Sequence, residues 1–145
     1  MEVKIRLTSR NAYIPAKGTT GSACFDLYSA ENTILNSWSS GSISTDLKFK
    51  IPDQFFGKIY SRSGQFLRER VTVEGRIIDS DFRGVLKVLM FNHSSVAYKI
   101  KVGQRIAQLW FFKEIPVEFK KVEAFDEPEP QNERQECGFG STGDF

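Results

Sequence analysis

The sequence predicts an all-β domain, and three observations lead to this fold class. Hydrophobic side chains alternate with charged ones in several short stretches, which is the period of a half-buried strand. Clusters of Gly, Pro, Ser and Asn separate these stretches. Long amphipathic stripes with the helical period are absent. Short strands separated by such turns favour a sandwich or a barrel.

Each element follows from its own local pattern. Aliphatic and aromatic residues alternate with lysine and arginine in the expected strands 3–7, 47–51, 98–102 and 117–122. A further strand is expected at 58–60, followed by one or two helical turns within 64–70. The segment 77–84 lies between two apolar stretches, so we expect a hairpin or a sharp bend there.

Composition limits the class of protein. The chain has 145 residues, which is the size of one compact domain, and 40% hydrophobic residues are enough for a core. Its apolar runs fall far short of the ~20 residues that cross a bilayer, so no membrane is expected. The N-terminus alternates charged and aliphatic residues, unlike a signal peptide. We therefore expect an intracellular protein, in the cytoplasm or the nucleus.

Charge and rare residues exclude several kinds of site. The formal net charge of +2 is too small for the basic footprint of a nucleic-acid-binding protein. Two distant cysteines, Cys24 and Cys137, form neither a disulfide scaffold nor a zinc site. The single histidine, His93, offers no obvious catalytic triad. Chemistry is therefore expected from carboxylates, hydroxyls, backbone amides and arginines.

The C-terminal residues differ from the rest. Residues 126–136 contain no apolar side chain except two prolines, so we divide the chain into a domain at 1–125 and a mobile arm at 126–145. The arm ends in a glycine-rich stretch at 138–143, with two hydroxyls and an aromatic ring. This stretch is either a phosphate cradle with a ring to cover a base, or a terminus without function.

Four further segments interrupt the strand pattern, and each has two interpretations. In 61–64, free amides and hydroxyls could hold an anion, or Ser63 could cap the short helix. Asp79 follows two β-branched residues and could act as a general base. Alternatively, Asp79 and Asp81 only form a turn, with Arg83 as their ion-pair partner; local sequence alone favours this reading.

The other two segments each hold a polar side chain in an apolar stretch. Asp26 could contact hydrated Mg²⁺, or it could accept hydrogen bonds from a neighbouring turn. Gln108 lies in an apolar strand, where a buried amide needs partners. It is therefore either a structural bridge or a ligand contact.

The order and spacing of these segments are more specific than any one of them. Segments 23–27, 61–64, 77–84, 103–109 and 134–143 resemble the five ordered motifs of the trimeric dUTPase family, a likeness that extends over about residues 12–143. The resemblance implies a jelly-roll β-barrel and a homotrimer with active sites shared between subunits. It also implies hydrolysis of dUTP to dUMP and pyrophosphate with Mg²⁺.

The resemblance assigns roles residue by residue. Asp79 matches the carboxylate that activates water, and Asp26 matches the one that contacts the metal through water. The positions that match phosphate contacts are Arg62, Ser63, Gly64, Gln108, Arg134, Ser141 and Thr142. Those that match nucleoside contacts are Gly75, Arg76, Ile78, Phe82, Phe139 and Gly140.

Some positions depart from the family pattern. Arg76 stands where glycine is usual. With Glu74 it places a bulky charged side chain on each side of Gly75. Phe82 replaces the usual tyrosine, and Gln65 and Phe66 replace a Leu-Ala pair. These departures motivate one alternative to an active dUTPase, an altered or inactive member that serves protein–protein recognition. The related deaminase of deoxycytidine triphosphate, which shares the fold, is a second alternative.

Overall fold

The structure is a computed structural model that describes residues 1–124 of the chain. Its first compact unit, Met1–Ile115, holds every helix and strand of these residues, and a second unit begins at Pro116. The predicted arm lies outside the described residues, together with the site residues assigned to it: Arg134, Phe139, Gly140, Ser141 and Thr142.

Strands dominate the described residues, with one short helix, so the predicted all-β class is confirmed. The helix is α1, Ser63–Glu69, which is the expected range 64–70 shifted by one residue toward the N-terminus. The strands are β1 Lys4–Leu7, β2 Phe25–Tyr28, β3 Thr33–Leu35, β4 Ser40–Ser44, β5 Leu47–Lys50, β6 Phe55–Tyr60, β7 Val71–Glu74, β8 Ile77–Ile78, β9 Lys87–Asn92, β10 Tyr98–Ile100 and β11 Arg105–Lys113.

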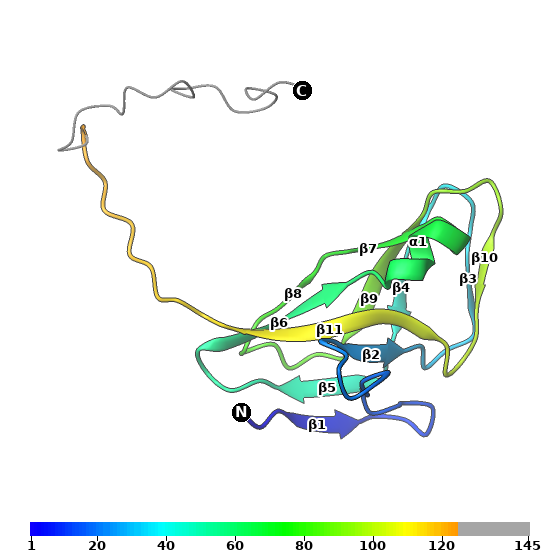
Figure 1. The fold of residues 1–145 in the computed structure, drawn as a ribbon, viewed down its shortest axis with the longest axis horizontal. Coiled ribbons are helices and arrows are strands. Elements are labelled where there is room, and N and C mark those ends of the chain that lie inside the picture. The colour runs from blue at the N-terminus through cyan, green and yellow to red at the C-terminus, as the bar shows by residue number, and fades with distance from the viewer. Residues whose placement is uncertain (125–145) are drawn as a thin grey trace. The chain divides into compact units, whose positions relative to one another are not determined.

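The strands form four antiparallel sheets in the described part of the chain, in the orders β1-β5, β10-β3, β2-β11-β6-β8 and β4-β9-β7. The long strand β11 runs between β2 and β6 (Figure 1). This pairing places Gln108 opposite both Asp26 and Tyr60. Segments that are far apart in the sequence therefore meet on one sheet.

The hydrophobic faces of these sheets form one core. Leu27, Leu47, Val73, Ile106 and Leu109 are fully buried within it. In β5 the burial alternates along the strand, as the sequence pattern predicts. The core therefore fixes which face each strand presents to solvent.

One predicted strand is wrong. Residues 117–122 follow the end of β11 and form no strand, and Phe119 is 97% exposed. Alternation predicts which face of a strand is buried, but a strand also needs an edge to pair with. Within the described residues, 117–122 have no such partner.

Asn92 at the end of β9 holds a loop together from inside the core. Its side-chain nitrogen donates to the carbonyls of Leu35, Asn36 and Val96, and its oxygen accepts from the amide and hydroxyl of Ser94. The residue is fully buried, so its truncation removes all of these bonds together with a packed side chain.

We expect Asn92→Ala to lower the free energy of unfolding by about 2–3 kcal/mol, because it removes several hydrogen bonds of one buried side chain at once, each contributing about 0.5–1.5 kcal/mol. Urea denaturation measures this change. The control is Asn11→Ala, at an exposed position, for which we expect less than about 0.5 kcal/mol. Equal effects of the two substitutions would contradict the role assigned to Asn92.

Candidate functional site

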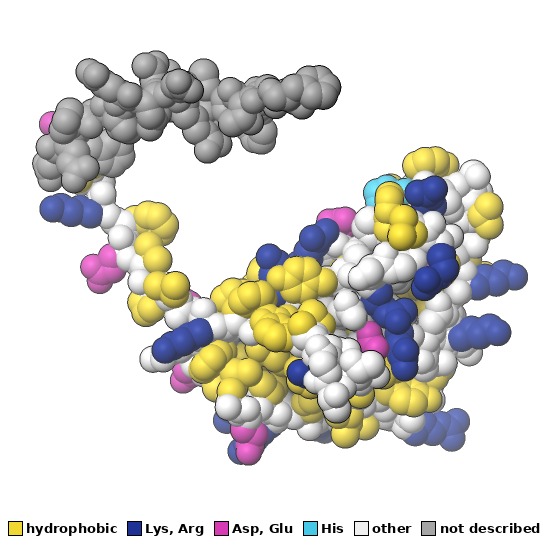
Figure 2. Space-filling model, viewed as in Figure 1, with side chains coloured by type: hydrophobic (Ala, Val, Ile, Leu, Met, Phe, Trp, Pro, Cys, Tyr) yellow, Lys and Arg dark blue, Asp and Glu magenta, His cyan; other side chains and the backbone are white. Residues whose placement is uncertain are grey.

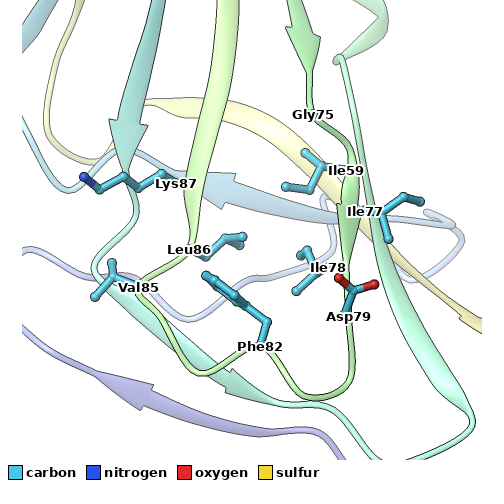
Figure 3. Close-up of a pocket in the computed structure, with 9 residues that line it drawn as sticks. All are labelled: Ile59, Gly75, Ile77, Ile78, Asp79, Phe82, Val85, Leu86 and Lys87. Carbon is cyan, nitrogen blue, oxygen red and sulfur yellow. The ribbon is translucent and has the colours of Figure 1, made fainter.

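A cavity of about 290 Å³ lies beside the turn that follows β8 (Figure 3). We call it the Asp79 cavity; its lining residues are Ile59, Gly75, Ile77, Ile78, Asp79, Phe82, Val85, Leu86 and Lys87. Four predicted site residues therefore meet here: Gly75, Ile78, Asp79 and Phe82. They come from both ends of β8, so this two-residue strand positions the whole group.

Asp79 combines two features that the sequence left as alternatives. Its backbone carbonyl accepts a hydrogen bond from the amide of Phe82 at 3.2 Å, which closes a turn. Its carboxylate is exposed at the cavity and accepts no hydrogen bond from the described residues (Figure 3). Forming the turn therefore leaves this carboxylate available for a ligand or a water molecule.

The predicted ion pair between Arg83 and the aspartates of this turn is wrong. The Arg83 Nη1 atom instead donates to the backbone carbonyls of Ser80 at 2.6 Å and Phe82 at 3.0 Å. These bonds hold the turn through its backbone, so Arg83 does not neutralise Asp79.

Phe82 faces the cavity opposite Asp79 (Figure 3). Its ring lies so close to Gly84 that a Cβ atom there would come within 2.7 Å of the ring. Gly84 therefore makes room for the aromatic side chain, and a larger residue would displace it. The ring remains 39% exposed, enough for it to pack against a ligand.

Arg76 does not line the Asp79 cavity. Its Nε atom donates to the carbonyl of Val73 at 2.9 Å, and its Nη2 atom lies 3.9 Å from Glu74 Oε2. Between them, Gly75 has a φ of 57°, a left-handed conformation that glycine adopts without strain. The bulky charged side chains around Gly75 thus leave the cavity open.

The segment 61–64 leads from β6 into α1. Arg62, and not Ser63, is the N-cap residue, so the predicted cap is wrong; Ser63 is the first helical residue. Amides in the first turn of a helix have no partner within the helix, and those of Ser63 and Gly64 occupy such positions. The segment therefore offers backbone donors beside the Arg62 guanidinium.

Asp26 on β2 binds two arginines from different segments. Arg62 Nε lies 3.3 Å from Asp26 Oδ1, and Arg105 Nε on β11 lies 3.4 Å from Asp26 Oδ2. The carboxylate is 6% exposed, whereas the two arginines are 28% and 51% exposed. Both guanidiniums are thus oriented by one buried carboxylate and still reach solvent.

Arg105 is a site residue that the sequence interpretation missed. It belongs to the expected segment 103–109, but an arginine at the start of an apolar strand looks like any solvated charge. Only the pairing of β11 with β2 brings it to Asp26. Figure 2 shows basic side chains gathered beside α1 and β2.

A second, more open cavity of about 370 Å³ contains Gln108, and we call it the Gln108 cavity. It is lined by Ala23, Cys24, Tyr60, Ser61, Gln108, Trp110 and Phe112. Gln108 is half-buried rather than buried, and its amide makes no hydrogen bond to another described residue. This favours a ligand contact over a structural bridge. The two cavities share no lining residue.

Cys24 at the Gln108 cavity has a raised pKa. Partial burial disfavours the thiolate, the nearby Asp26 carboxylate adds to this effect, and Lys17 partly offsets it. Because the thiolate is the reactive form, we expect slow alkylation at neutral pH.

In a Cys137→Ser variant, iodoacetamide should therefore label Cys24 more slowly than free cysteine at pH 7. The rate should keep rising above about pH 8.5, where free cysteine is half ionised. Mass spectrometry at several pH values measures both rates. A Cys24 rate equal to that of free cysteine would contradict the raised pKa.

No group of three or more His, Cys, Asp and Glu residues in 1–124 could hold a metal ion directly. Among the described residues, Asp26 is the acidic group that pairs with both Arg62 and Arg105, and both of its oxygens already face guanidiniums. A carboxylate keeps further lone pairs that can accept from a metal-bound water. These residues therefore fit a hydrated ion carried by a ligand, and not an ion held by protein alone.

The helix found in residues 1–124 is too short and too polar to cross a membrane.

Comparison with known proteins places these features in one family. The dUTPase family model matches residues 10–143. The deoxyuridine 5′-triphosphate nucleotidohydrolase of Candida albicans is 37% identical over 141 residues, covering 97% of this chain and 87% of the relative. The dUTPase of Staphylococcus bacteriophage 80alpha, solved with dUpNHpp, is 29% identical, with a TM-score of 0.86 over 98% of both chains.

A third similar protein was solved with a metal. The dUTPase of phage phi11 of Staphylococcus aureus, described with a structural Mg(II) ion, is 25% identical, with a TM-score of 0.81 over 88% of this chain and all of that one. The predicted fold of jelly-roll type, with one short helix, is thereby confirmed. Since the family match includes the segments that line both cavities, the chain belongs to the dUTPase family.

Proposed function

We propose that this chain hydrolyses dUTP to dUMP and pyrophosphate. The observation that carries the proposal is the Asp79 cavity, which is lined by the Asp79 carboxylate, the Phe82 ring and the left-handed Gly75. Family membership and the nucleotide-bound relative support the choice of substrate. As nucleotides are the substrate, we place the protein inside the cell, in the cytoplasm or the nucleus.

In this proposal Asp79 acts as the general base. Its carboxylate takes a proton from a water molecule, and that water oxygen attacks the α-phosphorus of dUTP. The bond from the α-phosphorus to the bridging oxygen breaks, and pyrophosphate leaves with the bridging oxygen. The role suits a carboxylate that accepts no hydrogen bond from the described residues, because its lone pairs are available to take a proton.

The nucleoside would lie in the Asp79 cavity. The Phe82 ring would pack against the deoxyribose, with Gly75 and Ile78 along the base. Stacking of an aromatic ring on a base contributes about 1–3 kcal/mol, and we assign that contact to Phe139 of the arm, with Gly140 beside it. Arg76 would support this site through the Val73–Gly75 turn rather than by touching the base.

The phosphates would bind near the Gln108 cavity, between the segment 61–64 and strand β11. Arg62 and Arg105 supply positive charge, and Ser63, Gly64 and Gln108 supply neutral donors. Arg134, Ser141 and Thr142 of the arm would add contacts to the same phosphates. When bound with the triphosphate, Mg²⁺ would neutralise charge there, with Asp26 contacting it through water.

We further propose a homotrimer with shared active sites. The separation of the two cavities supports this arrangement, because one chain alone does not bring Asp79 and Gln108 to a common cavity. Exposed apolar side chains support it as well: Ile77 and Leu89 are 54% and 41% exposed. Figure 2 shows hydrophobic side chains gathered over β6, β8 and β11.

The test is to incubate the purified chain with one nucleotide at a time, dUTP, dTTP, dCTP or UTP, with Mg²⁺ present in each incubation. We expect pyrophosphate and the monophosphate from dUTP, and far less from the other three. Absence of pyrophosphate from dUTP would overturn the proposal and favour the alternative, a dUTPase-fold protein that serves protein–protein recognition. Nothing in the open Asp79 cavity favours that alternative.

A further inference from the structure

Strand β7 lies at the edge of its sheet, since the strand order is β4-β9-β7. Val73 pairs with Met90 of β9, but its own N–H and C=O bond elsewhere, on the outer edge of the strand. Val73 is fully buried, so water cannot reach these two groups. A buried peptide group needs a partner, and here the sheet does not supply one.

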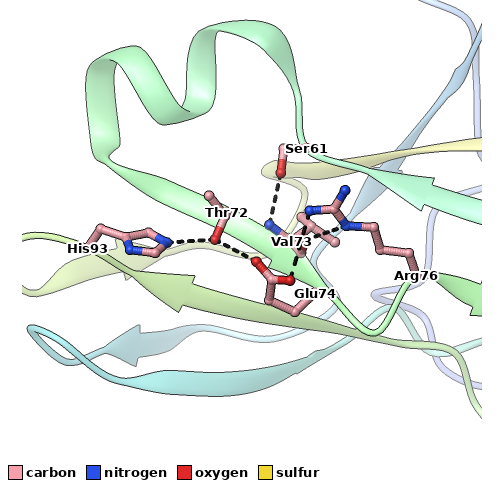
Figure 4. A network of polar contacts seen from close by, with 6 residues as sticks. All are labelled: Ser61, Thr72, Val73, Glu74, Arg76 and His93. Atoms are coloured by element: carbon pink, nitrogen blue, oxygen red, sulfur yellow. Dashed lines mark hydrogen bonds and ion pairs between the residues drawn. The ribbon is translucent and has the colours of Figure 1, made fainter. Parts of the chain in front are cut away.

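Two side chains supply the missing partners (Figure 4). The Val73 N–H donates to Ser61 Oγ at 2.9 Å, and the Val73 carbonyl accepts from Arg76 Nε at 2.9 Å. Both peptide groups of one residue are therefore satisfied by side chains from the segments on either side of β7.

These two side chains belong to the two parts of the site. Ser61 lines the Gln108 cavity and directly precedes Arg62. Arg76 spans the turn at Gly75, which lines the Asp79 cavity. Its side chain bonds back to the residue three positions earlier, as a backbone amide does in a β-turn. Val73 thus connects the segment 61–64, which we call the phosphate loop, with the turn at Gly75 in the wall of the Asp79 cavity.

The Arg76 side chain is supported in turn by a chain of polar contacts along β7. Glu74 Oε2 lies 3.9 Å from Arg76 Nη2, and Glu74 Oε1 accepts from the Thr72 hydroxyl at 3.0 Å. Since that hydroxyl donates its only proton to Glu74, it accepts from Nε2 of His93 at 2.8 Å (Figure 4). A line of contacts from His93 through Thr72 and Glu74 therefore leads to the arginine, whose direct hydrogen bond is the one to Val73.

We propose that Ser61 and Arg76 are positioning residues: through Val73 they fix the Gly75 turn against the phosphate loop. The proposal rests on the proposed function, because the parts they hold together are the nucleoside and phosphate portions of the dUTP site. Neither residue reacts with the substrate. They determine how well the empty site is arranged before dUTP binds, so they act on KM more than on kcat.

The test measures dUTP turnover and amide hydrogen exchange in two variants, Ser61→Ala and Arg76→Gly. Each should raise KM for dUTP about fivefold or more, the loss expected from one hydrogen bond, with kcat within about twofold. The double variant should raise KM by less than the product of the two single effects, because both act on the same residue. Residues 71–79 should exchange faster in each variant.

Conservative variants separate positioning from a general structural role. Ser61→Thr and Arg76→Lys keep a hydroxyl and a donor, so KM should return to within about twofold of the unsubstituted chain. The controls are Ser42→Ala and Arg10→Gly, at exposed positions without a side-chain hydrogen bond or ion pair among the described residues; neither should alter KM or exchange. If Ser61→Ala fails to fold, Arg76→Gly decides, because its side chain is partly exposed.

Unchanged KM in a folded Arg76→Gly variant, or loss of kcat with unchanged KM, would overturn the positioning role. An unsubstituted chain that releases no pyrophosphate would instead overturn the proposed function. In that case hydrogen exchange alone tests whether Ser61 and Arg76 hold the turn. Unchanged exchange at residues 71–79 in both variants would overturn their positioning role.

Discussion

The substitution Asp79→Asn should reduce dUTP turnover by about 10²–10⁴, the range expected when a general base is lost. An amide cannot take the proton from water, but it has nearly the size of the carboxylate and should leave the cavity intact. Binding of a non-hydrolysable dUTP analogue should therefore stay within about threefold of the unsubstituted chain. Pyrophosphate release and calorimetric titration measure the two quantities.

The matched control is Asp53→Asn, which removes an exposed carboxylate from a different turn. We expect it to leave both turnover and binding unchanged. If Asp79→Asn kept more than about a tenth of the rate, another group would have to take the proton. Loss of binding together with turnover would show that Asp79 shapes the cavity instead.

Asp26→Asn should raise KM for dUTP about tenfold and lower the free energy of unfolding by about 1–2 kcal/mol. The carboxylate is buried and orients both Arg62 and Arg105, so its loss leaves two neighbouring cations without their shared partner. The expected cost to stability is moderate because both guanidiniums are partly exposed and keep contact with water. Steady-state kinetics and urea denaturation measure the two effects.

The companion variant Arg105→Gln removes one cation and keeps the Arg62–Asp26 ion pair. It should raise KM less than Asp26→Asn does, because one guanidinium stays oriented. Unchanged KM in Asp26→Asn would show that the arginines find their positions without this carboxylate.

The sequence predicted the elements that depend on local pattern. The alternation around Leu47 and Phe49 corresponds to β5, and the short helix forms where it was expected, with its bounds shifted by one residue. The same argument failed at 117–122, because alternation carries no information about which edge a strand pairs with. The cap at Ser63 failed by one residue, since the helix begins there and not after it.

In the candidate site, too, contacts within one segment could be predicted, whereas contacts between distant segments could not. The segment 77–84 is continuous in sequence, so the grouping of Asp79 with Phe82 at one cavity could be expected from it. The partners of Asp26 could not, because Arg105 reaches it only through the pairing of β2 with β11. Likewise the direction of the Arg76 side chain depends on the Val73 carbonyl, which no neighbouring strand among the described residues pairs with, because β7 lies at the edge of its sheet. A local sequence pattern does not reveal which strand is at an edge.

The most direct test of the catalytic account is hydrolysis of dUTP in water enriched with oxygen-18, with the products analysed by mass spectrometry. Attack on the α-phosphorus by water activated at Asp79 predicts one heavy oxygen in dUMP and none in pyrophosphate. Heavy oxygen in pyrophosphate would place the attack on the β-phosphorus and contradict the account.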